Sequence, residues 1–246
     1  MTTVAVIADP PVDGFVLPEL ADGPLDESER TALYTAMVTD VCRAVEASGA
    51  ELLVNYRPGE QVPDGVDSEA TVRDALDGQL DTPSGARYEV QVGSSRSARV
   101  GNTVTHLLER EGVKTAAAVP PTAALLTRQL VDSAAMKLRS SAVVLGPATD
   151  GRVYYAGFAD PVDFEDAYDT PAVETLTERG SEADLNVDFL ATTPVVETPA
   201  DLRTVVPLLR ARHRGERVVP PRTTALIEEF GLRVRTGGDS PELVRA

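Results

Sequence analysis

Short runs of small and β-branched residues alternate along the chain with longer segments of helical periodicity. The first four runs are TVAVIA at 3–8, ELLVNY at 51–56, YEVQV at 88–92 and KTAAAV at 114–119. Alternation of this kind predicts a layered α/β domain with a mainly parallel sheet, which binds ligands at the carboxyl ends of its strands. We therefore expect an α/β fold, a single-domain three-layer sandwich around a mostly parallel mixed sheet.

The remaining strands are expected at 142–146, 153–158 and 187–191. Helices are expected where apolar residues recur at spacings of three or four. The first runs from Asp26, which with Glu29 has the spacing of a capping box, to Gly49. The other helices are expected at 68–77, 97–110, 123–138, 170–179, 199–212 and 222–230. Residues 1–230 then form the domain, and residues 231–246 form a C-terminal tail.

The charge of the chain excludes some partners. It has 39 acidic and 23 basic residues and a net charge of −16, and only Lys114 and Lys137 are lysines. Binding to phosphate backbones needs clustered cations, so nucleic acid is not an expected partner. An acidic, lysine-poor surface is typical of proteins from salt-adapted organisms, in which carboxylates keep the chain hydrated. A halophilic source is therefore expected.

Cysteine content and hydropathy suggest a compartment. Cys42 is the only cysteine, so an intramolecular disulfide is excluded and a reducing compartment is expected. The first residues, MTTVAVIADPP, lack a basic segment, and no apolar run approaches the roughly 20 residues that cross a bilayer. We expect a cytoplasmic protein without a membrane partner. The chain could also form a homo-oligomer.

The loop after the first strand carries acids where a phosphate site would carry cations. In such folds this loop is the usual phosphate site, because backbone N–H groups converge there. Here it reads ADPPVDGFVLPELADG, with Gly14 and Gly23 but with neither lysine nor arginine. A carboxylate about 4 Å from a phosphate charge costs on the order of 4 kcal/mol. A triphosphate in this loop would need a divalent cation beside it.

Several motifs resemble one family. They are VVLGPATDGRVYYAG at 143–157, YDTPAV at 168–173, VVETPADL at 195–202 and LYTAMVTD at 33–40. In this order they resemble the phospholactate guanylyltransferase-like branch of the glycosyltransferase A and nucleotidyltransferase fold. The resemblance covers roughly residues 3 to 210. It implies a nucleotide-diphospho-sugar transferase-like fold, a nucleotide or nucleotide sugar as ligand, and Mg²⁺ or Mn²⁺ as cofactor.

The chain departs from the family pattern at the positions that handle phosphate and metal. The cations of the family's first loop fall on Leu17 and Glu19, and another falls on Asp9. A metal-binding aspartate falls on Thr122, whose neutral hydroxyl is a poor ligand for Mg²⁺. In the second acidic motif only Glu197 is kept, which makes it the one candidate metal ligand.

Several candidate ligand-binding residues remain, and most of them have an alternative interpretation. Asp150 and Gly151 could contact a sugar or ribose, but Asp-Gly between two strands is also an ordinary hairpin turn. Tyr154 and Tyr155 alternate on a strand, so one would pack in the core and the other could line a cleft. Gly14 is the candidate in the first loop. Glu197 precedes Thr198-Pro199 and could instead serve the first turn of a helix.

The segment GSSRS at 93–97 is the one place where glycine, cations and a helix start coincide. Arg96, with Arg99 nearby, could bind an anion there. The alternative is a solvated linker with a serine cap.

Two functions fit these observations. Loss of the phosphate and metal motifs favours a transferase-like protein with altered or absent catalysis. The alternative is an active, metal-dependent nucleotidyl or glycosyl transferase. Acids of the first loop that bind a metal or a cationic ligand are a third possibility.

Overall fold

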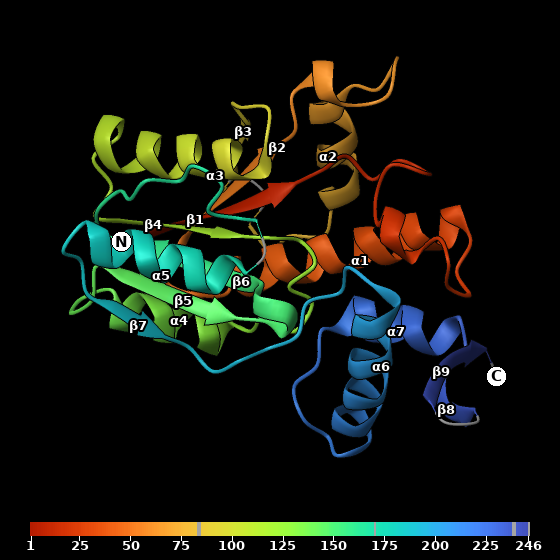
Figure 1. Ribbon diagram of the computed structural model, residues 1–246. Coiled ribbons are helices and arrows are strands. Elements are labelled where there is room, and N and C mark those ends of the chain that lie inside the picture. The colour runs from red at the N-terminus through yellow and green to blue at the C-terminus, as the bar shows by residue number, and fades with distance from the viewer. Residues whose placement is uncertain (83–84, 170, 238–239, 246) are drawn as a thin grey trace.

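The computed structural model describes residues 1–82, 85–169, 171–237 and 240–245. Its main sheet has the order β3-β2-β1-β4-β6-β5-β7, in which only β6 runs antiparallel to its neighbours (Figure 1). The strands are β1 Thr2–Ala8, β2 Glu51–Tyr56, β3 Arg87–Val90, β4 Thr115–Val119, β5 Val143–Pro147, β6 Val153–Phe158 and β7 Val187–Phe189. The predicted mostly parallel, mixed sheet is confirmed, and each strand end agrees with its predicted position within two residues.

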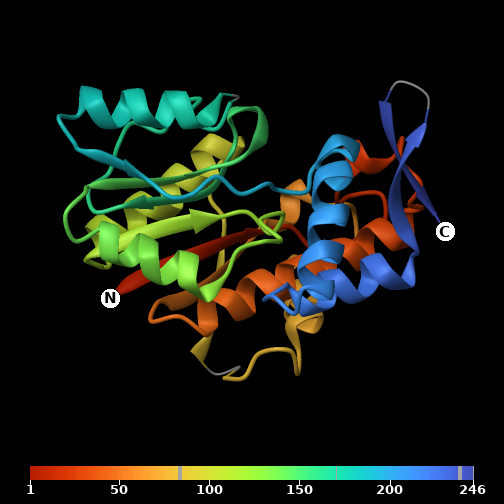
Figure 2. The ribbon, with the colours of Figure 1, turned by 90° about the horizontal axis from the view of Figure 1, so that it is seen from below.

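Helices cover both faces of the sheet, which gives the predicted three layers (Figure 2). They are α1 Glu27–Glu46, α2 Ser68–Leu76, α3 Arg96–Thr105, α4 Arg128–Lys137, α5 Ala172–Glu182, α6 Pro199–Arg214 and α7 Pro221–Glu229. Apolar residues of α1, α2 and α4 pack on one face, and those of α3 and α5 pack on the other. The π-helical turn η4, His106–Arg110, continues α3. Short 3-10 turns are η1 Pro18–Leu20, η2 Gly59–Gln61 and η5 Thr149–Gly151.

Two helices begin later than predicted. Helix α4 begins at Arg128 because Thr127 caps it, its hydroxyl accepting from the Leu130 N–H, and residues 121–125 form turns. Helix α5 begins at Ala172, and the predicted start at position 170 lies outside the described residues. No helix in the described part of the chain is long and apolar enough to cross a membrane.

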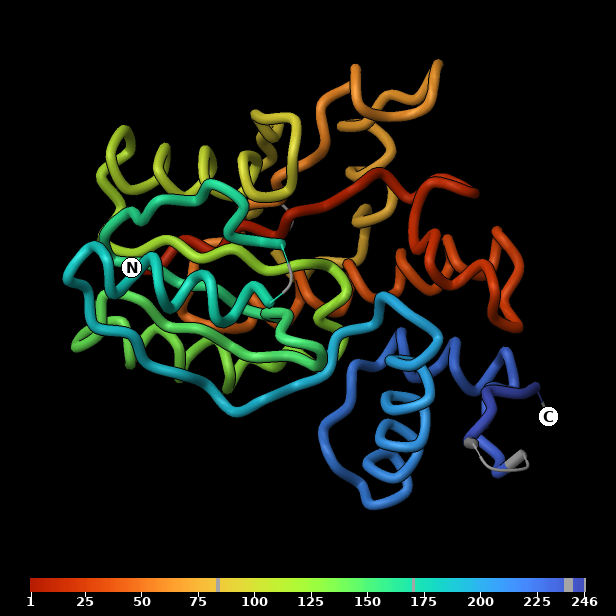
Figure 3. The backbone as a smooth tube through the Cα atoms, viewed as in Figure 1, coloured from red at the N-terminus to blue at the C-terminus, as the bar shows by residue number. Residues whose placement is uncertain are grey.

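A third apolar cluster lies beyond the carboxyl ends of the strands. It joins the loop after β1, the first half of α1, and helices α6 and α7. After β7 the chain crosses to this side of the molecule, as the tube in Figure 3 shows. Leu202, Val205 and Leu209 of α6 and Ile227 of α7 are fully or almost fully buried there. This cluster closes one side of the space at the strand ends.

The segment predicted to be a C-terminal tail is mostly a hairpin. Strands β8, Leu232–Gly237, and β9, Ser240–Arg245, pair antiparallel, and residues 238, 239 and 246 lie outside the described part. Leu232 is fully buried in the third cluster, and Arg245 bonds to Glu29 and to the Pro24 carbonyl. Burial of Leu232 and the bonds of Arg245 explain why this segment is packed rather than free.

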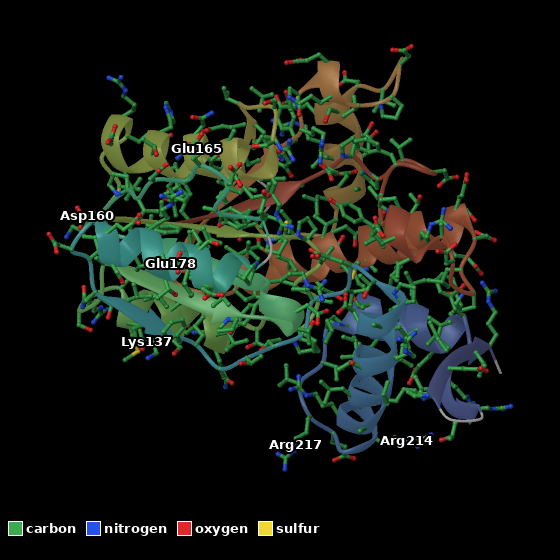
Figure 4. All side chains as sticks on the ribbon, viewed as in Figure 1. Lys137, Asp160, Glu165, Glu178, Arg214 and Arg217 are labelled. Carbon is green, nitrogen blue, oxygen red and sulfur yellow. The ribbon has the colours of Figure 1, made fainter. Side chains whose placement is uncertain are left out.

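Charged side chains lie mainly on the outer surfaces of the helices and loops. Figure 4 labels Asp160, Glu165, Glu178 and Arg214, and all four are exposed. The buried residues of the sheet are mostly alanine, valine and leucine, with the aromatic residues of β6. The excess of acid is therefore a property of the surface and does not by itself describe any cleft.

Candidate functional site

Charged side chains converge on a cavity of about 160 Å³ at the carboxyl ends of β1, β2 and β4. Its charged lining consists of Asp9, Arg57, Arg96, Arg99 and Glu197. This is the edge at which a parallel sheet presents its loops and helix N-termini to a ligand. The cavity contains more guanidinium groups than carboxylates.

Asp9 and Arg57 meet because their strands are parallel neighbours. Ala8 of β1 lies opposite Tyr56 of β2, so the residues that follow these two are also adjacent. Arg57 forms a two-pronged ion pair with Asp9, in which Nη2 lies 3.0 Å from Oδ2 and Nε bonds to Oδ1. The backbone N–H of Asp9 donates to the Tyr34 hydroxyl at 2.7 Å. The Asp9 carboxylate at the cavity is thus neutralised by Arg57.

Arg99 differs from the other cavity arginines. Its side chain comes from the first turn of α3, and the residue is only 6% exposed. Nη1 donates to the Gln61 Oε1 atom and to the Ser94 carbonyl, both at 3.3 Å. Among the described residues, Arg99 forms no ion pair and its buried Nε has no hydrogen-bond partner. Burial, together with the positive charges of Arg57 and Arg96, lowers the pKa of Arg99.

Arg96, Glu197 and Tyr168 also line the cavity and lie close to one another. Arg96 Nη1 lies 3.6 Å from Glu197 Oε1, and its guanidinium stands 5.5 Å from the centre of the Tyr168 ring. Burial raises the pKa of Tyr168 well above its usual value. Its hydroxyl has no hydrogen-bond partner within the described ranges. A buried donor without a partner, beside a cation, marks a position where a ligand oxygen could bind.

A second arginine, Arg152, also contacts the Glu197 carboxylate. Arg152 Nη1 lies 3.1 Å from Glu197 Oε2, and the Thr122 hydroxyl donates to Glu197 Oε1 at 3.0 Å. Arg152 also holds Asp201 of α6, with Nη2 to Oδ1 at 2.6 Å and Nη1 to Oδ2 at 2.9 Å. Burial raises the pKa of Asp201, but the bonds from Arg152 and from backbone N–H groups outweigh it and hold that pKa below its usual value. The Glu197 carboxylate is therefore oriented by two guanidiniums and a hydroxyl.

Solved structures share this fold. No model of a known protein family matches the chain, and no curated protein does. A protein assigned as a nucleotide-diphospho-sugar transferase, from Desulfovibrio desulfuricans G20, superposes with a TM-score of 0.74 at 20% identity, covering 93% of this chain and 94% of that one. The chain has the fold of the nucleotide-diphospho-sugar transferases. At this identity the likeness shows the fold alone.

Two further structures support the same assignment at greater distance. A cytidylyltransferase from Leptospira borgpetersenii serovar Hardjo-bovis has a TM-score of 0.52 at 8% identity, over 93% of this chain and 94% of that one. A 4-diphosphocytidyl-2C-methyl-D-erythritol synthase from Anaerococcus prevotii has 0.50 at 12%, over 85% and 96%. The resemblance inferred from the motifs is thus confirmed at the level of the transferase fold.

The first loop of this transferase fold packs into the third apolar cluster. Leu17 is buried there with a left-handed backbone, and Gly14 and Glu19 are exposed. Of residues 9–23 only Asp9 lines the cavity. Gly14 has a φ of +74° and lies near the Glu27 carboxylate. The predicted ligand contact at Gly14 is not seen at the cavity, because the apolar residues of the loop draw it into the cluster.

The turn at Asp150 and Gly151 joins two antiparallel strands, as the hairpin interpretation expects. The Asp150 side chain is 77% exposed, and its one ion pair among the described residues is with Arg152, at 3.4 Å. Gly151 has a φ of +71°, and a Cβ there would lie 2.6 Å from the Pro171 Cβ. Close packing therefore explains this glycine. Neither residue lines the cavity.

The interpretation of Tyr154 as a cleft residue is wrong. Tyr154 and Tyr155 are both fully buried. The Tyr154 hydroxyl donates to the Ala191 carbonyl at 2.9 Å, and its ring lies against Gly146. The register shift between Gly146 and Pro147 of β5 accompanies this packing. Simple alternation of faces therefore does not place one tyrosine in the cleft.

Glu197 lines the cavity, but its surroundings do not fit a divalent metal. Both of its oxygens already accept hydrogen bonds, from Thr122 and from Arg152. Mg²⁺ requires free, hard oxygen ligands in near-octahedral geometry. Within the described residues no group of three or more acidic, histidine or cysteine side chains is placed to hold an ion. The oxygens of Glu197 contact the guanidinium groups of Arg96 and Arg152 and are not free for a metal ion.

The segment 93–97 contributes to the cavity through Arg96, and α3 adds Arg99. Ser95 caps α3, its hydroxyl accepting from the Ala98 N–H at 3.1 Å. The first loop lacks cations, as the sequence shows, but Arg57, Arg96 and Arg99 from other elements line the cavity. Sequence reasoning missed Arg57 as a site residue, although its place directly after β2 was a usable signal. It also missed Arg152.

Proposed function

We propose that the protein binds the phosphate-bearing part of a nucleotide or nucleotide sugar in the cavity of Arg57, Arg96 and Arg99. The observation that carries this proposal is Arg99, a buried guanidinium without a carboxylate partner among the described residues. A buried charge without a partner is costly, and a bound anion would supply the missing interaction. Arg99 is therefore the residue on which binding should depend most.

The chemistry of the lining favours a phosphate. Guanidinium groups are planar and match phosphate oxygens with paired hydrogen bonds. Arg57 is held by Asp9 and Arg96 faces Glu197, so both keep their positions before a ligand arrives. The volume of about 160 Å³ is below the 300–1,000 Å³ or so of pockets that enclose a whole small molecule. The cavity would hold the phosphate group and leave the base outside.

Catalysis in this protein is altered or absent under the same proposal. The carboxylate that remains at the cavity, Glu197, is engaged by Arg152 and Thr122 rather than free for a metal. The alternative is an active, metal-dependent nucleotidyl or glycosyl transferase that uses Mg²⁺ or Mn²⁺. The motif at 143–157 further suggests descent from the phospholactate guanylyltransferase-like branch. Guanosine nucleotides therefore belong among the ligands to be tested.

The test is calorimetric titration of the full chain with pyrophosphate, nucleoside triphosphates and nucleotide sugars, with Mn²⁺ or with EDTA, at low and at multimolar KCl. Binding that persists in EDTA is expected. Arg99→Met should weaken it about 10- to 100-fold, because a charge-assisted hydrogen bond contributes about 1.5–3 kcal/mol. The same variant should be as stable as the wild type or up to about 1 kcal/mol more stable, because a buried unpaired charge is removed.

The matched control is Arg128→Met, which removes a surface arginine that is paired with Asp132 and does not line the cavity. Its affinity should equal that of the wild type. Equal affinity of Arg99→Met and the wild type would contradict the proposed site. Binding that requires Mn²⁺ would favour the active transferase, and no binding of any of these ligands would contradict a nucleotide function.

A further inference from the structure

Arg152 sits at the centre of a set of oxygen atoms from two segments, the turn before β6 and the start of α6. Its guanidinium touches the Asp201 and Glu197 carboxylates, the Thr149 hydroxyl at 2.8 Å and the Thr149 carbonyl at 3.0 Å. The Thr149 hydroxyl in turn donates to Asp201 at 3.1 Å. The side chain of Arg152 is 14% exposed and that of Asp201 is 2% exposed. The Glu197 and Asp201 carboxylates, each bonded to a threonine hydroxyl, share this cation, and the exposed Asp150 carboxylate lies 3.4 Å from it.

The two carboxylates converge on a single atom. Arg152 Nη1 lies 3.1 Å from Glu197 Oε2 and 2.9 Å from Asp201 Oδ2. An ion at that point would bind both after each oxygen moved by about 1 Å, since Mg²⁺ binds oxygen at about 2.0–2.1 Å. Oxygen-rich sets with two carboxylates suit Mg²⁺ or Mn²⁺. Here the position is filled by a covalently attached cation.

We propose that Arg152 is a built-in replacement for a divalent metal ion at this edge of the sheet. The guanidinium neutralises Glu197 and Asp201, keeps Glu197 turned toward Arg96 in the cavity, and leaves no vacancy for Mg²⁺ or Mn²⁺. Arg152 is thus a positioning residue, because its charge holds the two carboxylates in place as a bound metal ion would. Two results follow: the native protein has no stoichiometric divalent site here, and removal of the guanidinium creates one.

The test measures Mn²⁺ binding by electron paramagnetic resonance, with thermal unfolding in parallel. The wild type should bind Mn²⁺ only weakly, as its acidic surface does, and Glu197→Gln should not change this. Arg152→Ser should gain one Mn²⁺ per chain with an affinity at least about tenfold above the wild type. Mn²⁺ should also raise the Tm of Arg152→Ser and not that of the wild type, because a ligand stabilises the state that binds it.

Two controls tie the gained ion to this position. In Arg152→Ser with Glu197→Gln the gained site should be lost. Arg179→Ser removes a guanidinium between the exposed carboxylates of Asp163 and Glu182, so it makes the same charge change without convergent buried oxygens. That variant should gain no tight Mn²⁺ site.

These measurements distinguish a native Mn²⁺ site from one that appears only when Arg152 is removed. One Mn²⁺ per chain in the wild type that disappears in Glu197→Gln would overturn the proposal. So would an Arg152→Ser protein, folded or not, that neither binds nor is stabilised by Mn²⁺. Because these measurements use Mn²⁺ and no nucleotide, their result is independent of whether the cavity binds phosphate.

Discussion

Two arginines in this protein each hold three carboxylates, and their surroundings differ. Arg87, on the edge strand β3, contacts Glu51, Glu89 and Glu111, and its side chain is 32% exposed. Arg152 contacts Asp150, Glu197 and Asp201, and its side chain is 14% exposed. Each of these arginines with its three carboxylates has the same formal charge, although Arg96 adds a second cation beside Glu197. The two clusters nevertheless should contribute very differently to stability and to the site.

The difference lies in what water can do when the arginine is lost. At β3, the three glutamates are about a quarter to a third exposed, so solvent and salt can replace Arg87. Asp201 is almost completely buried, and water cannot replace Arg152 beside it. The arginine–carboxylate contacts should therefore contribute little to stability at the sheet edge. They should contribute much more at the strand ends, where Arg152 connects the β5–β6 turn to α6.

The largest expected effect comes from Arg152→Met in the absence of divalent ions. It leaves the buried Asp201 carboxylate without its cation, and the free energy of unfolding should fall by about 3–5 kcal/mol. Urea unfolding at neutral pH measures this change. If Asp201→Asn is added, part of the loss should return, because the unpaired charge is then gone. A fall below about 1 kcal/mol in Arg152→Met would show that the two clusters are equivalent.

Asp201→Asn alone should have a smaller effect that depends on pH. Its pKa is held below the usual 3.8, so its ionised form stabilises the folded state above that pH, and this stabilisation is lost as pH falls through the folded-state pKa. We expect Asp201→Asn to be about 2 kcal/mol less stable than the wild type at pH 7. The difference should stay constant down to about pH 5 and shrink below 3.8.

Unfolding of both proteins across this pH range provides the measurement. A difference that persists unchanged well below the usual aspartate pKa would mean that the Asp201 charge does not contribute. Arg152 would then act by packing alone, and the contrast with Arg87 would lose its electrostatic basis.

The sequence predicts the strands of the main sheet well because each strand is a short apolar run that can be recognised locally. TVAVIA and ELLVNY are buried strands wherever such runs alternate with amphipathic helices. The hairpin of β8 and β9 was missed, since residues 232–245 carry exposed arginines and little apolar pattern. Its stability comes from the burial of Leu232 in a cluster assembled by α6 and α7, which no local window contains.

The cavity is only partly readable from the sequence. Arg96 stands out because it opens a helix after a glycine, and the pairing of Asp9 with Arg57 follows once β1 and β2 are known to be parallel neighbours. Arg152 and Asp201 are 49 residues apart, and nothing local connects them. Acids counted along the first loop predicted a negative cleft because the arginines that balance them come from other elements.

The smallest expected effect comes from Arg87→Met. Glu111 accepts two bonds from Arg87, at 2.7 and 2.8 Å, and these bonds hold the pKa of Glu111 below its usual value. Solvent near β3 should nevertheless limit the loss of unfolding free energy to about 1 kcal/mol or less. Molar KCl should reduce it further, because the Debye length falls to about 3 Å. Parallel urea titrations of Arg87→Met and Arg152→Met at low and high KCl measure both clusters together. A loss at Arg87 as large as that at Arg152, and as insensitive to salt, would mean that exposure does not decide the strength of these networks.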